Sequence, residues 1–269
     1  MPASIVLHLQ AAHPGTYRHA TGPGVHGWWF QRWQTLNPAL ADAMHQPGRF
    51  APFTVSPVLG LPTPRQGPVE VAQGCQAWLR LTVLSTELDE HLPGFLDSLP
   101  PVLAVDGIVW QVNGISRTPE EFAWAGAASY DDMRSLLDQH NPPDLWTLEL
   151  MTPTAFNGKK TQFPFPLPDL MIRSWLERWN AFAPFALPDD LVRIGREDLS
   201  VANYSLHTLK ISEGIRQAIG CTGRLTLRAI EVHPAMRVAL HLLFTFAFYS
   251  GTGYHTTQGM GQTRLLRER

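Results

Sequence analysis

The most informative segment for the fold is Tyr249-Ser250-Gly251-Thr252-Gly253-Tyr254-His255-Thr256-Thr257-Gln258-Gly259-Met260-Gly261, near the end of the 269-residue chain. Its four glycines can take positive φ values and bring backbone N–H groups close to another group. Glycine loops that bind nucleotides lie between a strand and a following helix. Here an apolar run, Val238 to Tyr249, precedes the loop, and only a short strand-like piece, Gln262 to Leu266, follows it. We therefore expect no mononucleotide P-loop.

The loop and several upstream segments carry a family resemblance. Phe246 to Gly261 resembles the C-terminal glycine-rich loop of the CRISPR-associated repeat-RNA endoribonucleases, which belong to the RAMP superfamily. The other matches come in the family's order from about residue 30 to residue 266. They are Asn37-Pro38-x-Leu40-Ala41-x-x-x-His45, Pro52-Phe53-Thr54-x-Ser56-Pro57, Leu150 to Phe156 followed by Lys159-Lys160 and the prolines Pro164, Pro166 and Pro168, Leu170 to Phe182, and Ile219-Gly220-x-x-Gly223-Arg224.

This resemblance implies a function and a fold. The family cuts the precursor CRISPR transcript within each repeat and thereby releases guide RNAs. It implies a metal-independent endoribonuclease without a cofactor, whose partner is CRISPR repeat RNA, both as precursor and as mature guide. It also implies two tandem ferredoxin-like domains and a catalytic histidine at position 45.

The residue patterns agree with that fold class. The N-terminal half predicts the order β-α-β-β-α-β, which is the ferredoxin-like plan, and the C-terminal half predicts it again. We expect an α+β protein with two tandem ferredoxin-like (RRM-like) domains, at residues 1–140 and 141–269, and a turn at Gly22-Pro23-Gly24. The expected strands are 3–11, 53–59, 77–85, 102–116, 145–151, 199–212, 224–233 and 262–266, and the expected helices are 28–36, 38–45, 87–98, 169–182 and 235–249.

Composition narrows the class of protein. With 44% hydrophobic residues the chain can build a substantial core. The start of the chain alternates like a strand and shows no signal peptide, and the longest apolar run, Val238 to Tyr249, is too short to span a bilayer. Cys75 and Cys221 have no CxxC spacing, and the histidines form no HxxxH pair, so we predict neither a disulfide framework nor a metal site. We expect a cytoplasmic protein with no membrane contact.

Charge is distributed unevenly along the chain, although the net charge is only −2. Residues 87–144 hold eleven acidic residues against two basic ones, whereas residues 205–269 hold eight Lys or Arg against three acids. A polyanion would be attracted to the C-terminal part. The basic residues there that we expect to face it are Lys210, Arg216, Arg224, Arg228 and Arg264, although they can also be ordinary surface charge.

RNA carries its own nucleophile, because each 2′-OH lies next to a phosphate. An enzyme has to align the two groups, remove the hydroxyl proton and stabilise the charged phosphorane, which gives a 2′,3′-cyclic phosphate and a 5′-OH. A neutral imidazole suits the proton transfer since its pKa lies near working pH. We interpret His45 as this base, because it stands at the position of the family's histidine, at a predicted helix end before Pro47-Gly48. The alternative is a surface or capping histidine.

The rest of the predicted catalytic site departs from what several relatives show. Phe30 stands where some of them carry a tyrosine, and it has no hydroxyl to donate. Arg49 stands near the place of a lysine and could neutralise the phosphorane. His26 is either a second catalytic histidine or RNA contact, or a surface residue at the start of a helix.

Several residues are candidates for RNA binding. We expect backbone N–H groups of the glycine loop to hold phosphates, Tyr254 to stack on a base and His255 to contact a phosphate. The Lys159-Lys160 pair either binds the stem of the repeat or is simply solvated. Trp28, Trp29 and Trp33 form either a stacking platform or part of the core. The predicted RNA-binding residues are Lys159, Lys160, Arg224, Gly251, Gly253, Tyr254, His255, Thr257, Gly259 and Gly261.

Two other functions stay open at this point. A non-catalytic RNA-binding subunit of a CRISPR effector complex would share the fold and the glycine loop, and mutation of His45 would distinguish it from a nuclease. A nucleotide-binding metabolic enzyme would bind a free nucleotide and be indifferent to repeat RNA. Other Cas proteins are candidate partners, and so is a second copy of the chain, since relatives include dimers.

Overall fold

A computed structural model gives the fold, and it describes residues 1–46, 48–62, 67–158, 161–213 and 216–266. The chain forms two compact units. The first contains residues 1–127 together with 210–218 and 257–259, and the second contains 128–209, 219–256 and 260–269. The first long stretch thus ends at Ala127, before the expected boundary at 140, and two short later segments return to the first unit.

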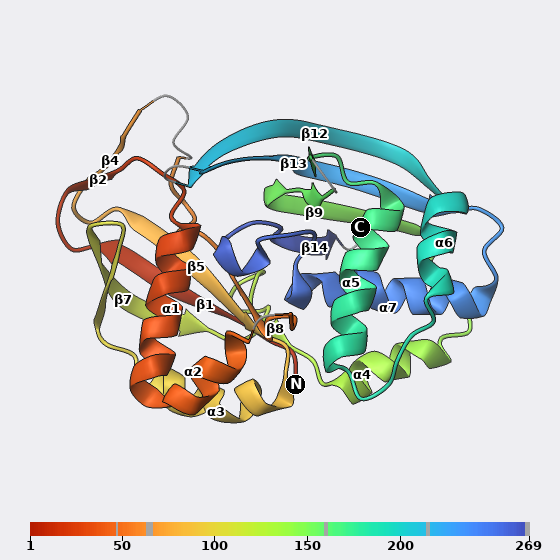
Figure 1. Cartoon of the computed structure of the whole chain (residues 1–269), viewed down its shortest axis with the longest axis horizontal. Helices are drawn as coiled ribbons and strands as arrows, with labels where there is room; N and C mark the ends of the chain where they lie inside the picture. Colours follow the sequence, from red (N-terminus) through yellow and green to blue (C-terminus); the bar gives the residue numbers. More distant parts are fainter. Residues whose placement is uncertain (47, 63–66, 159–160, 214–215, 267–269) are drawn as a thin grey trace. The chain divides into compact units, whose positions relative to one another are not determined.

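The first unit is built on an antiparallel sheet with the strand order β3-β5-β1-β7-β6, of which Figure 1 labels β5, β1 and β7. Helix α1 (Gly22–Leu36) and helix α3 (Thr86–Asp97) supply the two crossovers. The four strands β3, β5, β1 and β7 therefore follow the predicted ferredoxin-like plan, and β6 extends it by a hairpin. The sheet strands are β1 (Ala3–Ala11), β3 (Phe53–Val55), β5 (Gln76–Val83), β6 (Val102–Val105) and β7 (Ile108–Ser116), and the smaller elements are β2 (Gly15–Tyr17), α2 (Pro38–Met44), β4 (Val69–Val71) and β8 (Gly126–Ala127).

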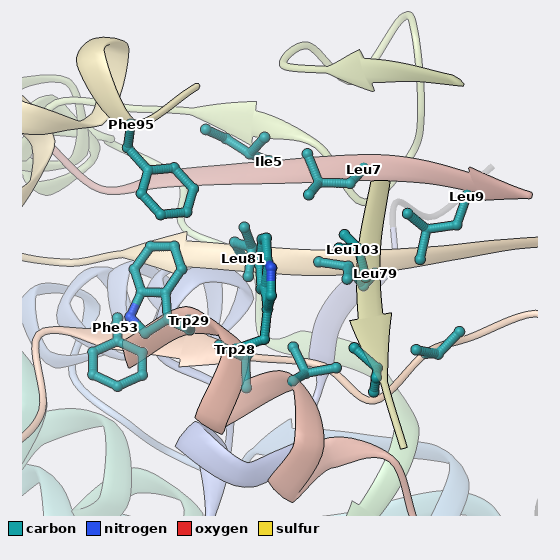
Figure 2. Packing of buried hydrophobic residues seen from close by; sticks show 14 of the residues in the cluster. Ile5, Leu7, Leu9, Trp28, Trp29, Phe53, Leu79, Leu81, Phe95 and Leu103 are labelled. Atoms are coloured by element: carbon teal, nitrogen blue, oxygen red, sulfur yellow. The ribbon is translucent and has the colours of Figure 1, made fainter. Parts of the chain in front are cut away.

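Alternate residues of β1 point into the core between this sheet and the helices. Ile5, Leu7 and Leu9 are buried with the side chains of α1 and α3, as Figure 2 shows. The three tryptophans of α1 are at most 8% exposed, and the ring of Trp33 stacks on Phe95 at a centroid distance of 4.9 Å. Trp28, Trp29 and Trp33 are therefore core residues and not a stacking platform for bases.

The opposite face of the same sheet is also covered. Phe122 packs on His8 and Trp78 with centroid distances of 5.3 and 4.9 Å. The fully buried Arg80 donates from Nε to the carbonyl of Trp124 at 3.1 Å. The segment after β7 thus fills the face on which RRM-like sheets bind single-stranded RNA.

The second unit repeats the plan with the strand order β12-β13-β9-β14 (Figure 1). Its core side carries Trp146, whose ring stacks on Phe244 of the long helix at 4.6 Å. No helix in the described ranges is long and apolar enough to cross a membrane. The elements are α4 (Tyr130–Ser135), η1 (Leu136–Asp138), β9 (Leu145–Thr154), β10 (Phe156–Asn157), β11 (Gln162–Phe163), α5 (Pro168–Phe182), α6 (Asp190–Glu197), β12 (Leu199–Glu213), β13 (Arg216–Ala229), α7 (Pro234–Ser250), η2 (Thr256–Gln258) and β14 (Thr263–Leu266), with η2 reaching into the short segment of the first unit.

Three sequence predictions about elements were wrong. Gly22-Pro23-Gly24 is the first turn of α1 and not a separate turn, because proline lacks an N–H that the first helical turn does not need. Helix α6 was not predicted, since it is only eight residues long; its buried apolar side chains are Leu191 and Ile194. Strand β3 ends at Val55 and does not reach residue 59.

Candidate functional site

Two of the predicted catalytic residues contact the same aromatic ring in the first unit. The ring of Phe30 on α1 contacts His26 of the same helix at a centroid distance of 4.8 Å. It contacts His45 at 5.0 Å, and both contacts are edge-to-face. His26, near the start of α1, and His45, at the end of α2, are therefore brought to the same ring.

The local sequence explains how α1 and α2 bring these side chains together. Asn37 ends α1, and its N–H donates to the carbonyl of Trp33 at 2.7 Å. The side chain of the same residue accepts from the N–H of Leu40 at 3.1 Å and so caps α2, which begins with Pro38. One residue thus makes the corner, and the short helix returns so that His45 reaches Phe30.

His26 is half-buried, and its ring is oriented by a hydrogen bond. Nδ1 lies 2.7 Å from the carbonyl oxygen of Thr257, so the ring donates an N–H there. Burial lowers the pKa of His26 from its usual value; the bond to Thr257 opposes that change, and the nearby His45 lowers the pKa further. The neutral ring is favoured near neutral pH, with its proton on Nδ1 and the Nε2 lone pair available as an acceptor.

His45 is the exposed member of the pair. It follows the last residue of α2, and its backbone N–H donates to the carbonyl of Asp42 at 3.1 Å. The expected placement at an exposed helix end is confirmed. A substrate phosphate could approach His45 from solvent without any rearrangement of the core.

Arg49, the third predicted catalytic residue, lies on the exposed turn after α2. Its N–H approaches the carbonyl of Gln46 at 3.4 Å. Within the described part of the chain, no hydrogen bond or ring contact joins its side chain to either histidine. Its role as a phosphate-neutralising group stays a prediction.

Four backbone N–H groups of the glycine-rich loop have acceptors within the protein. The N–H groups of Gly251 and Gly261 donate to the carbonyls of Ala247 and Pro153, both at 3.0 Å. That of Gly253 donates to the hydroxyl of Ser174 at 2.9 Å, and that of Tyr254 donates to the carbonyl of Ala155 at 3.0 Å. These four donors are engaged within the second unit. Phosphate binding by the glycine-rich loop stays a prediction.

The glycines are required for close backbone packing. Gly253 has a φ of +82°, and a Cβ there would lie 2.2 Å from the carbonyl oxygen of Ala155. Gly261 has a φ of +69°, and its Cβ would lie 2.1 Å from the carbonyl oxygen of Thr252. Both positions combine a left-handed conformation with no space for a side chain.

The other predicted RNA-binding residues fall in different places. Tyr254 and His255 are half-buried with their rings 4.3 Å apart, and His255 has a positive φ of 54°. Arg224 is exposed on β13, opposite Glu149 of β9. Lys159 and Lys160 lie outside the described residues. Contact of any of these residues with RNA stays a prediction.

Two structural roles could not be predicted from the sequence. Arg178 on α5 donates to the carbonyl of Gly253 at 2.7 Å and to the hydroxyl of Ser174 at 2.6 Å, which anchors the glycine-rich loop. The Ser-x-x-x-Arg spacing on α5 is the only signal for this anchor. The contact between His26 and Thr257 joins residues 231 positions apart, and no local sequence pattern predicts it.

Comparisons with known proteins agree with this architecture. The family model of the CRISPR-associated endoribonuclease Cas6 matches residues 148–263. A curated Cas6 endoribonuclease of Streptococcus thermophilus is 22% identical over 137 residues, and the alignment spans 50% of this chain and 56% of that protein.

Solved structures match over nearly the whole chain. A product complex of a Thermus thermophilus Cas6 is 30% identical, with 99% of this chain and 100% of that chain covered and a TM-score of 0.81. A second Cas6 product complex is 24% identical, with 99% of both chains covered and a TM-score of 0.79.

Both the strand orders and these likenesses define a RAMP-like α+β protein with tandem ferredoxin-like folds. With 30% identity over its full length to a Thermus relative, the chain belongs to the CRISPR-associated endoribonuclease Cas6 family.

Proposed function

We propose that this protein is an endoribonuclease that cuts CRISPR repeat RNA in the precursor transcript and so produces guide RNAs. The observation that carries the proposal is the His26–Phe30–His45 cluster, in which two histidines contact one ring within the first unit. The family membership and the relatives solved as product complexes support the choice of substrate.

The chemistry is attack of a 2′-OH on the adjacent phosphate. One group removes the hydroxyl proton, and another protonates the leaving 5′ oxygen, which gives a 2′,3′-cyclic phosphate and a 5′-OH. A pair of histidines can supply both transfers without a metal ion.

The two histidines differ in a way that suggests a division of these roles. His26 favours its neutral form, and its proton is held on Nδ1, so Nε2 is available to accept a proton. These properties suit a general base. The exposed His45 then serves as the acid, although the sequence alone assigned it the role of base. The charge on His45 is one of the causes that lower the pKa of His26, so protonation of His45 favours the neutral form of His26.

Arg49 supplies positive charge next to the phosphorane in this proposal. It lies four residues after His45 on an exposed turn, so its guanidinium can move toward a bound phosphate. Phe30 contacts both histidines and takes no part in proton transfer.

The test is cleavage of labelled repeat RNA by the purified protein in EDTA. The arms are the normal RNA, the same RNA with one 2′-deoxy sugar at the cut site, and the His26→Ala, His45→Ala and His91→Ala variants. His91 is an exposed histidine on α3 and serves as the matched control. We expect single-site cutting of the normal RNA only, a cyclic phosphate end, and a loss of at least about 100-fold in both site variants.

Other outcomes would assign the protein differently. Tight binding of the repeat without cutting by the wild type would favour a non-catalytic subunit of an effector complex. Cutting that persists in His45→Ala and His26→Ala would place the active site elsewhere.

A further inference from the structure

The short segment Thr257–Gly259 is the part of the glycine-rich loop that belongs to the first unit. It carries the carbonyl oxygen that lies 2.7 Å from Nδ1 of His26. We propose that the Thr257 carbonyl, held in place by a backbone seat between Gly22 and Gly259, is a positioning group that fixes His26 in its Nδ1–H tautomer. The inference rests on the proposed function, because the tautomer matters only if His26 transfers a proton.

The seat consists of two glycines whose backbones touch. A Cβ on Gly22 would lie 1.9 Å from the carbonyl oxygen of Gln258 and 2.9 Å from Cα of Gly259. A Cβ on Gly259 would lie 2.9 Å from Cα of Gly22, and the φ of Gly259 is +97°. Any side chain at either position would push the segment away from α1.

A third segment fixes the same corner. Pro57 is 3.1 Å from the position of a Cβ on Gly259. Its neighbour Val58 donates its N–H to the hydroxyl of Thr21 at 2.8 Å, and Thr21 is buried directly before α1. The start of α1, residues 57–58 and residues 257–259 therefore hold one another.

This corner lies one helical turn from His26. Gly22 and His26 are four residues apart on α1, so both face the same side of the helix. Displacement of the segment at Gly22 therefore moves the acceptor of His26 directly. Catalytic groups tolerate errors of only about 0.5 Å, which is far less than the overlap that a methyl group at Gly22 would create.

The hydrogen bond determines which nitrogen acts on the substrate. A carbonyl oxygen can only accept, so Nδ1 has to carry the proton and Nε2 has to carry the lone pair. The rings of Phe30 and Phe53, at 4.8 and 6.0 Å, restrict rotation of the imidazole. His45 is the titratable group whose charge acts on His26. Loss of the carbonyl would let the ring exchange its proton between the nitrogens and turn away.

The experiment combines imidazole ¹⁵N NMR with cleavage of repeat RNA under single-turnover conditions. In the wild type we expect the neutral ring of His26 to carry its proton on Nδ1. Gly22→Ala should shift the ring toward the Nε2–H form and lower the cleavage rate constant at least about 10-fold, with the RNA affinity unchanged. Gly27→Ala is the matched control, because it lies on the same helix and its new methyl group would meet nothing within 4 Å.

Two further variants separate positioning from chemistry. His26→Asn can still donate to Thr257 but lacks Nε2, so we expect a folded protein without cleavage. His26→Gln removes the donor near Thr257 and should also abolish cleavage, although the backbone contacts between Gly22 and Gly259 are unchanged in this variant.

The outcomes are distinguishable. A wild-type ring protonated on Nε2 would overturn the inference, whether or not Gly22→Ala folds. A folded Gly22→Ala protein that has lost the Nδ1–H form but cuts at the wild-type rate would also overturn it. If the wild type does not cut repeat RNA at all, the proposed function fails. The NMR comparison of wild type and Gly22→Ala still tests whether the backbone seat fixes the tautomer of His26.

Discussion

The guanidinium of Arg178 donates a hydrogen bond to the carbonyl oxygen of Gly253 at 2.7 Å. The same side chain donates to the hydroxyl and to the carbonyl of Ser174, one turn earlier on α5. Ser174 in turn accepts from the N–H of Gly253. Helix α5 therefore holds both polar groups of one loop residue, and the glycine-rich loop is a fixed structural element of the second unit.

This anchor predicts a large effect of Arg178→Met on stability. The substitution keeps much of the side-chain volume but leaves the Gly253 carbonyl without this donor in a buried position. Burial already lowers the pKa of the guanidinium to about 10, so the group is still charged at neutral pH. We expect a loss of about 2 to 4 kcal/mol in the free energy of unfolding, measured by denaturant titration. Arg173→Met, on the exposed side of the same helix, is the control and should change stability by less than about 0.5 kcal/mol.

The tight packing of Gly253 leads to a second prediction about the same loop. Gly253→Ala would place a methyl group against the carbonyl oxygen of Ala155 at a positive φ. We expect a destabilisation of about 3 kcal/mol or more, seen as a lower midpoint of thermal unfolding. Gly94→Ala on α3 meets nothing within 4 Å and should stabilise the protein slightly. Equal midpoints for the two variants would contradict this account of the loop.

The pH dependence of cleavage should follow His26. A base has to be neutral, and burial lowers the pKa of His26, so the fall in rate on the acid side should begin only below the usual histidine pKa of about 6.5. His45 lowers the same pKa by charge repulsion, so the NMR titration of His26 should move upward in the His45→Gln variant. The rate profile is measured under single-turnover conditions. A half-maximal rate above pH 6.5 on the acid side would contradict the assignment of His26 as base.

His241 on α7 predicts a pH dependence of stability. Trp146 donates from Nε1 to Nδ1 of His241 at 3.1 Å, which requires an unprotonated Nδ1, and burial lowers the pKa of this histidine. The unfolded chain therefore binds a proton more readily than the folded one, so stability falls as pH drops below about 6.5. In His241→Asn the amide oxygen can still accept from Trp146 and cannot titrate. Urea unfolding at pH 7.5 and pH 5.5 should show a smaller loss in this variant than in the wild type.

Arg224 offers a test of the basic surface on the second sheet. Arg224 on β13 pairs with Glu149 on β9. Glu149 also accepts a hydrogen bond at 2.6 Å from Arg264 of β14, on the other side of β9. If Arg224 contacts a phosphate, Arg224→Ala should weaken RNA binding and reduce the slope of log Kd against log salt by about 1. Arg193 is the control, since it pairs with Asp190 and Glu197 on α6 and should leave the slope unchanged when replaced by Ala. An unchanged slope in Arg224→Ala would remove this residue from the interface.

Much of the fold could be predicted because its signals are local. The alternation of Ile5, Leu7 and Leu9 predicts a strand with one buried face, and the strand runs from Ala3 to Ala11 as expected. The order of strands and helices then predicts two ferredoxin-like units, and both sheets have the corresponding strand order. Helix α6 was not predicted, because its eight residues are too few for a helical period to be recognised with certainty in the sequence.

The candidate residues could be identified from the sequence: the two histidines, the arginine after them and the glycine-rich loop. What these residues do together depends on how the chain packs. Phe30 contacts both His26 and His45 because Asn37 turns the chain between two helices. The Thr257 carbonyl reaches His26 because Gly22 and Gly259 let two distant backbones touch. A glycine in a sequence can indicate that there is no room for a side chain at that position. It does not say which backbone fills that space, because packing between segments far apart in the sequence selects the partner.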